Sequence, residues 1–229
     1  RQRYTRYHAD LTTGFDAFWA GLSSNSRSQL KRKAKRIAEL SGGALRVERF
    51  ADPAALEQFH AIARRVSVTT YQETLMGAGL PADAGFVREM LAAGAGNRAR
   101  GWLLWVGDEP AAYLYGEAAG AVLRYDHVGH DPRFNDLSPG SVLMLEAFRD
   151  LMVEARFERF DFTEGEGQHK RQFATRGTPC VDLLLLRPTL ANRTAMAALS
   201  GFDRLTATAK RAATHPALKG LAKKVRRAG

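Results

Sequence analysis

Cysteine is almost absent from this 229-residue chain, in which Cys180 is the single example. One thiol cannot form an internal disulfide, and Cys180 opens an apolar stretch, so we predict a buried thiol in a reducing, cytoplasmic compartment. Long apolar runs are also missing, because the longest, VDLLLLRP, has only the length of a strand. This argues against a membrane-spanning helix. No secretory signal peptide is recognisable either.

Acidic residues are scarce at both ends of the chain. Residues 1–50 contain eleven Lys or Arg against four Asp or Glu, and residues 193–229 contain nine against one. Residues 51–192 contain fourteen against nineteen, so the net charge of +10 comes from the two ends. A nucleic-acid-binding protein spreads positive charge over its reading surface, which is not the pattern here. We expect the basic ends to be docking surfaces for an anionic membrane surface or a protein partner.

The order of predicted elements indicates an α/β (α+β) fold with one main core. RGWLLWV, PAAYLYGEA and AVLRYDHVGH alternate as strands, and the turns between them contain Gly107-Asp108 and Ala119-Gly120, which makes an antiparallel meander. A helix over 138–155 and strands over 159–162 and 180–187 are predicted to follow. This order predicts a mixed sheet with helices on both faces and a ligand near the start of the helix at 138.

A basic helix is predicted near the N-terminus, in RSQLKRKAKRIAEL. Ser26 and Gln29 form a capping box at its start, and Gly42-Gly43 ends it. The acidic residues that usually alternate with basic ones on a solvated helix are nearly missing. The basic face is therefore either solvated or the rim of a site for an anionic ligand, and the sequence leaves both open. Its residues are Lys31, Arg32, Lys35 and Arg36.

The helix over 138–155 has a well-marked start. Ser138 is a good N-cap, Pro139 suits the first helical position, and Gly140 allows a ligand close to the backbone. The free amides of such a helix end can hold a phosphate or pyrophosphate. A capped helix without any anion is the alternative.

The stretch RYDHVGHDPRFNDLSPGSVLMLEAF, followed by FDFTEGEGQHKRQFAT, resembles the acyltransferase domain of CelD-like proteins. These form a branch of the GNAT superfamily associated with bacterial cellulose and exopolysaccharide synthesis. The resemblance spans roughly residues 4–187. The matching positions are Tyr125-Asp126, Ser138-Pro139-Gly140, Asp161-Phe162, Gly165, Lys170 and Phe173.

This resemblance implies a GNAT-like domain over 1–190 and a basic helical extension over 191–229. It implies acetyl-coenzyme A or another acyl-coenzyme A as donor, with Ser138, Gly140 and Ser141 as donor-binding residues. The implied acceptor is a polysaccharide, a sugar or another small cell-envelope precursor. The expected location is cytoplasmic, peripheral to the inner membrane if the basic ends dock there.

The chain departs from typical GNAT enzymes at their glycine loop, which Leu137-Ser138-Pro139-Gly140 replaces. Two alternative functions follow from the resemblance. The family is also similar to Fem-type aminoacyltransferases, whose donor is a charged tRNA that the basic ends would contact. A degenerate GNAT domain could instead be a non-catalytic adaptor on a membrane-bound polysaccharide synthase.

Acyl transfer needs a base for the acceptor and hydrogen-bond donors for the developing oxyanion. Asp126 lies in an apolar sheet, where an unpaired carboxylate would be costly, so it is a candidate general base or acceptor-orienting group. An ion pair of Asp126 with Arg124 or Lys170 is the alternative.

The loop after the strand at 159–162 contains further candidates. Glu164 and His169 could act as acid or base on a glycine-flanked loop. By resemblance, Tyr125, Asp161, Lys170 and Phe173 contact the substrate, with Lys170 on an anionic group. Tyr71 could close over the substrate from a loop. His127, His130 and Asp131 do not have helical metal-ligand spacing, so no metal is predicted.

Overall fold

The computed structural model describes residues 2–70, 73, 79–165, 167–183 and 185–214. The chain divides into two compact units, Gln2–Val181 and Asp182–Gly229, and Arg1 groups with the second. Tyr71, predicted to close over a substrate, lies outside the described residues, as does the basic stretch after residue 214.

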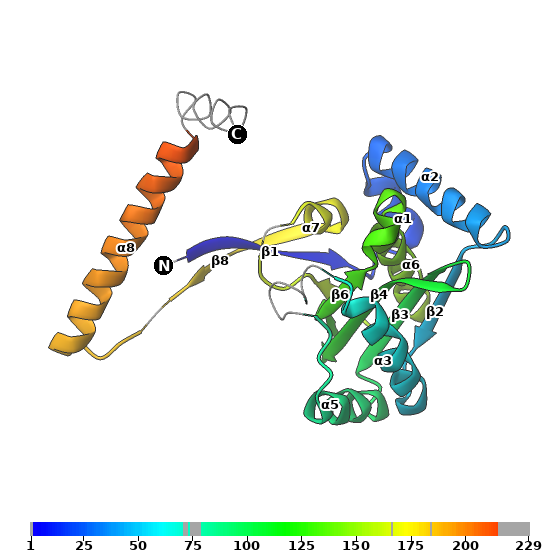
Figure 1. The fold of residues 1–229 in the computed structure, drawn as a ribbon, viewed down its shortest axis with the longest axis horizontal. Coiled ribbons are helices and arrows are strands. Elements are labelled where there is room, and N and C mark those ends of the chain that lie inside the picture. Colours follow the sequence, from blue (N-terminus) through cyan, green and yellow to red (C-terminus); the bar gives the residue numbers. More distant parts are fainter. Residues whose placement is uncertain (1, 71–72, 74–78, 166, 184, 215–229) are drawn as a thin grey trace, which may run out of the picture. The chain divides into compact units, whose positions relative to one another are not determined.

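The first unit is built on an eight-stranded mixed sheet (Figure 1) with the order β2-β3-β4-β5-β7-β1-β8, in which β6 pairs with β4. The neighbours β5 and β7 run parallel, and the pairs β1–β7, β2–β3, β3–β4, β4–β5 and β4–β6 run antiparallel. The strands are β1 Gln2–Asp10, β2 Arg46–Phe50, β3 Ala99–Val106, β4 Glu109–Ala119, β5 Val122–Arg124, β6 His127–His130, β7 Arg159–Asp161 and β8 Arg176–Asp182. The predicted mixed sheet is confirmed.

Helices cover both faces of this sheet, as predicted. On one face lie α1 Phe15–Gly21, α2 Ser24–Leu40, α6 Pro139–Glu154 and the short α7 Gln168–Phe173; on the other lie α3 Pro53–Ser67 and α5 Ala84–Ala95. The side chains of successive β4 residues point to opposite faces of the sheet. Leu114 packs in the hydrophobic core that includes α6, and Tyr113 packs in the core that includes α3. Phe148 of α6 is fully buried and packs against Phe160 at a centroid distance of 4.9 Å.

Three sequence predictions about α2 and β8 were wrong. The cap of α2 is Ser23, whose hydroxyl accepts a hydrogen bond from the Ser26 amide at 3.1 Å, so the helix begins before the predicted capping box. Among the described residues the last strand is β8, which spans Arg176–Asp182, so the strand predicted over 180–187 begins earlier and ends earlier. Cys180 is only partly buried on β8 because little packs over this strand.

Asp52 caps α3, and its loss is expected to destabilise the first unit. Its carboxylate accepts a hydrogen bond from the Ala55 amide at 2.9 Å, and Pro53 occupies the first helical turn. Asp52→Ala should lower the free energy of unfolding by about 1 kcal/mol, measured by urea denaturation. Glu57→Ala removes an equal charge from an exposed position of the same helix and is the matched control. Equal losses in the two variants would contradict the capping role.

The second unit contains α8, Leu190–Thr214. Among the residues that the structure describes, no helix is long and apolar enough to cross a membrane.

Candidate active site

The sheet opens where the chain passes from β5 to β6. Arg124 is paired with Asp161 on β7, and the Tyr125 amide donates to the Asp161 carbonyl at 2.9 Å. From His127 onward the strand pairs with β4, opposite Tyr115. β5 and β6 are thus a single predicted strand, interrupted at Tyr125-Asp126, and β6 separates from β7 after the interruption.

Gly116 on β4 makes this interruption possible. A Cβ atom at this position would lie 2.2 Å from the carbonyl oxygen of Arg124, which is far inside van der Waals contact. Only glycine lets the two backbones approach so closely. A side chain here would push β5 away from β4 and alter the opening.

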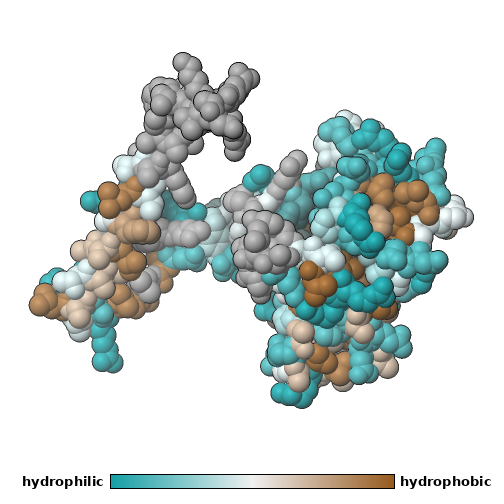
Figure 2. Space-filling view, viewed as in Figure 1, coloured by the Kyte–Doolittle hydropathy of each residue, from teal (hydrophilic) through white to brown (hydrophobic). Residues whose placement is uncertain are grey.

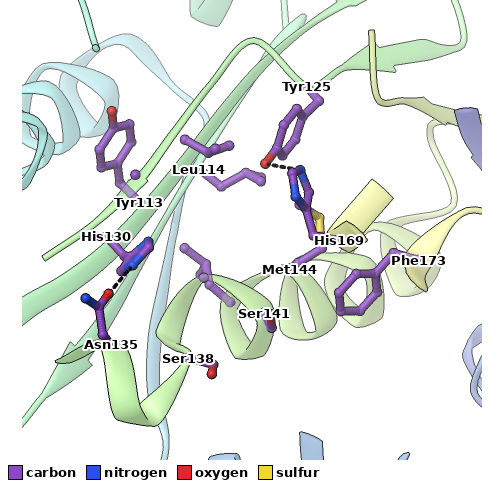
Figure 3. A pocket seen from close by; sticks show the side chains of 14 residues that line it. Tyr113, Leu114, Tyr125, His130, Asn135, Ser138, Ser141, Met144, His169 and Phe173 are labelled. Atoms are coloured by element: carbon purple, nitrogen blue, oxygen red, sulfur yellow. Dashed lines mark hydrogen bonds between the residues drawn. The ribbon is translucent and has the colours of Figure 1, made fainter. Parts of the chain in front are cut away.

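A cavity of about 340 Å³ lies at the opening (Figure 3), between β4, β6, α6 and α7. Its wall is largely apolar and includes Leu114, Met144 and Phe173. Two hydrogen-bonded pairs of polar side chains lie on it, one formed by Tyr125 and His169 and the other by His130 and Asn135. The predicted residues Ser138, Gly140 and Ser141 also line this cavity.

Tyr125 and His169 form the first polar pair. The Tyr125 hydroxyl and Nε2 of His169 are hydrogen-bonded at 3.2 Å, and the two rings lie 5.8 Å apart. Where Nε2 carries the hydrogen of the neutral ring, Nδ1 is the free proton acceptor. Burial raises the pKa of the Tyr125 hydroxyl, so it stays protonated at neutral pH. Partial burial lowers the pKa of His169, and the charge of Lys170 lowers it further, so the imidazole is neutral. The pair therefore holds one ready proton acceptor and one ready proton donor.

His130 and Asn135 form the second polar pair, which the sequence analysis missed. Nε2 of His130 donates to Oδ1 of Asn135 at 2.7 Å, which leaves Nδ1 as an acceptor. Nδ1 lies 3.9 Å from the position of a Cβ at Gly140, so it faces the start of α6. From the sequence, His130 was a candidate only for a metal site. The described residues contain no group of three or more His, Cys, Asp or Glu side chains that could hold a metal.

The start of α6 differs from the predicted cap. Ser138 has a left-handed backbone conformation (φ 50°, ψ 52°), and its hydroxyl makes no capping bond. Its carbonyl accepts the amides of Ser141 and Val142 at 3.1 and 3.3 Å, and Pro139 has no amide hydrogen. Within the first turn this leaves the Gly140 amide for a ligand. An anion bound here would therefore depend on neighbouring side chains as well as on the helix end.

Such side chains line a second cavity of about 540 Å³, which shares Ser138 and Ser141 with the first. Lys33 of α2 and Arg171 of α7 contribute its positive charge, and the Lys33 ammonium donates to the Asp136 carbonyl. The basic residues that the sequence left as either a solvated face or a cationic rim do not line this cavity. Lys31 lies over the Trp19 ring at 5.6 Å, and Lys35 is 3.9 Å from Glu39. Lys33, which was not singled out from the sequence, is the α2 lysine that lines this cavity.

The two predicted carboxylates do not line either cavity. Asp126 accepts the Glu117 amide at 2.9 Å and pairs with Arg124 at 3.1 Å, the alternative that the sequence left open. It thereby bridges the interrupted strand. Asp161 accepts two bonds from Nε of Arg6, at 3.0 and 2.9 Å, which tie β7 to β1. In this arrangement both carboxylates hold the sheet together.

Lys170 and Glu164 also lie outside the lining of the cavities. Lys170 is buried, its ammonium donates to the Glu164 carbonyl, and it lies 6.0 Å from the centre of the Tyr125 ring. It therefore fixes the glycine-flanked loop beneath Tyr125 and lowers the pKa of His169 from the adjacent position. The Glu164 side chain is exposed on this loop.

Comparison with known proteins identifies the fold. A family model described as an acetyltransferase (GNAT) domain matches residues 24–171. The crystal structure of FemX superimposes with a TM-score of 0.51 at 11% identity, covering 72% of this chain and 54% of FemX. A conserved protein of unknown function from Bacteroides thetaiotaomicron gives a TM-score of 0.52 at 11% identity, covering 78% of this chain and 60% of that one. The chain thus spans less than two thirds of either structure. No curated protein matches it in sequence.

Proposed function

The chain belongs to the GNAT acetyltransferase domain family, and from this premise we propose that it is an acyltransferase that moves an acyl group from acyl-coenzyme A to a sugar, polysaccharide or cell-envelope precursor. One observation carries the choice of donor. An apolar cavity at the sheet opening adjoins a cavity with two cationic side chains, and the two share Ser138 and Ser141.

The residues present suit such a donor at both of its ends. Acyl-coenzyme A has an uncharged arm that ends in a thioester and, at its other end, a phosphorylated nucleotide. The apolar wall at Leu114 and Met144 suits the arm, and Lys33 and Arg171 suit phosphates. Ser138 and Ser141 add hydroxyl groups between them. When bound, the donor would supply an acyl group that is activated toward attack.

Tyr125 and His169 would transfer the protons of the reaction. The neutral imidazole of His169 can accept a proton from the attacking amine or hydroxyl, and the protonated Tyr125 hydroxyl can return one to the leaving sulfur. Gly129 of the separated strand β6 also lines the cavity. His130, held by Asn135, would contact the bound donor near the start of α6.

Lys33→Ala is expected to weaken binding of acetyl-coenzyme A about tenfold or more, because a charge-assisted hydrogen bond to phosphate contributes about 1.5–3 kcal/mol. Calorimetric titration measures the affinity. Lys35→Ala, at a side chain that is 79% exposed on the same helix, is the matched control and should bind as the unmodified protein does. Acetyl-pantetheine lacks the nucleotide phosphates, so Lys33→Ala should not change its affinity.

No binding of acetyl-coenzyme A at low salt would overturn coenzyme A as the donor. The same titration with a charged tRNA then tests the Fem-type alternative, whose affinity should fall steeply with added salt because α2 presents exposed basic residues. Binding of the donor without transfer to any amine or hydroxyl acceptor would instead support the adaptor function.

The acceptor is proposed from the resemblance to the CelD-like branch. Transfer of a radiolabelled acetyl group to cello-oligosaccharides and to glucosamine oligosaccharides tests it, with a lysine-containing peptide as the comparison. Preferential labelling of the peptide would contradict a glycan acceptor and leave the acyltransferase activity intact.

A further inference from the structure

The helix α8 has an apolar side that is exposed to solvent. Leu199, Phe202 and Leu205 recur every three residues, and they are 53%, 64% and 70% exposed. At about 100° per residue these positions fall on one side of the helix. The small residues Ala191, Ala195 and Ala198 fall on the same side. Figure 2 shows hydrophobic side chains gathered along this helix.

Positive charge lies on the opposite side of α8. By the same spacing, Arg193 and Arg204 are turned about half a revolution away from Phe202. The sequence of this helix contains one acidic residue, Asp203. Residues 193–229 as a whole contain nine basic residues and one acidic residue. An apolar side opposed by a basic side, with low overall hydrophobicity, is typical of helices that lie in the interface of an anionic membrane.

We propose that α8 docks the protein on an anionic lipid surface, with Leu199, Phe202 and Leu205 buried at the boundary of the acyl chains. Charge complementarity favours lipid over a second copy of the chain. A second copy would bring one strongly basic segment beside another, whereas anionic headgroups attract and neutralise the positive charge. This inference does not depend on the identity of the acyl donor or acceptor.

Sedimentation of the full chain with lipid vesicles tests the proposal. We expect binding to vesicles of phosphatidylcholine mixed with phosphatidylglycerol, weak binding to phosphatidylcholine alone, and release as salt is raised. Phe202→Ser/Leu205→Ser should lower the affinity for the anionic vesicles at least tenfold. Met196→Ser/Ala197→Ser places the same new hydroxyls away from the side of Phe202 and should bind like the unmodified protein.

Three results would overturn the proposal. One is equal binding to the neutral and the anionic vesicles, or no binding to either. Another is a lower melting temperature of the lipid-free Phe202→Ser/Leu205→Ser variant, which would mean that this side of α8 packs against protein. The third is a concentration-dependent dimer that this variant abolishes, which would identify a second copy as the occupant. Circular dichroism with anionic vesicles checks that the control variant keeps its helix.

Discussion

Replacing His169 with alanine is expected to lower kcat/KM for acyl transfer about a hundredfold to ten-thousandfold, which is the usual contribution of one general base. His169 lines the cavity, and its Nε2 is hydrogen-bonded to the Tyr125 hydroxyl at 3.2 Å. Release of the free thiol from acetyl-coenzyme A in the presence of an amine acceptor measures the rate. His60→Gln removes another histidine, which bonds to the Pro81 carbonyl away from the cavity, and is expected to leave the rate unchanged.

The pH profile distinguishes a proton acceptor from a residue that only supports the fold. The pKa of His169 is lowered from its ordinary value of 6.5 by burial and by Lys170, and only the neutral ring can accept a proton. Therefore kcat/KM should be constant around neutral pH and fall on the acid side, below the ordinary histidine range. In His169→Ala this acid limb should be missing. An unchanged acid limb would show that a different group, such as His130, is the base.

Replacing Arg100 with alanine is expected to lower the free energy of unfolding by about 3–5 kcal/mol, because it removes a buried guanidinium and leaves the partly buried Glu154 carboxylate without its main partner. Arg100 is 1% exposed, and its Nε donates to Oε2 of Glu154 at 3.1 Å. The guanidinium also donates to the Ala99 carbonyl and to the Asn97 side chain, each at 2.7 Å. Urea denaturation measures the loss.

Two further measurements separate the ion pair from packing. Arg100→Met/Glu154→Leu removes both charges and should be clearly more stable than Arg100→Ala. Burial opposes the charge of Glu154, yet the guanidinium groups of Arg100 and Arg49 lower its pKa overall. The pair therefore contributes stability above the ordinary carboxyl pKa and loses it as the pH falls through the lowered value. A difference between the unmodified protein and Arg100→Ala that is independent of acid pH would contradict this assignment.

Local sequence patterns were sufficient for the architecture and for the position of the cavity. Alternation of apolar residues predicted the meander, and Ser138-Pro139-Gly140 marked the helix start that lines both cavities. His169, on a loop behind this helix, and Tyr125, by resemblance, were also among the predicted site residues, and both line the cavity. These features depend on neighbours in the chain, which a sequence displays directly.

Features that depend on distant partners could not be predicted in this way. Asp161 looked available for chemistry because its partner, Arg6, is 155 residues away in the sequence. Asp126 accepts a backbone amide that becomes available only because the strand is interrupted opposite Gly116. Lys33 was one of several basic residues on its helix, and the approach of α7 and the start of α6 distinguishes it from the others.

Gly116 is essential to this fold although it has no side-chain functional group. The opening that forms the proposed acyl-transfer site depends on the Arg124 carbonyl oxygen, which lies 2.2 Å from where a Cβ atom of residue 116 would be, so even alanine would push the two strands apart at the interruption. Loss of activity after substitution would therefore not identify Gly116 as a participant in the reaction. A survey of tolerated substitutions across this chain would therefore find Gly116 as intolerant as the residues proposed to transfer protons, although Gly116 has no side chain that could contact a substrate.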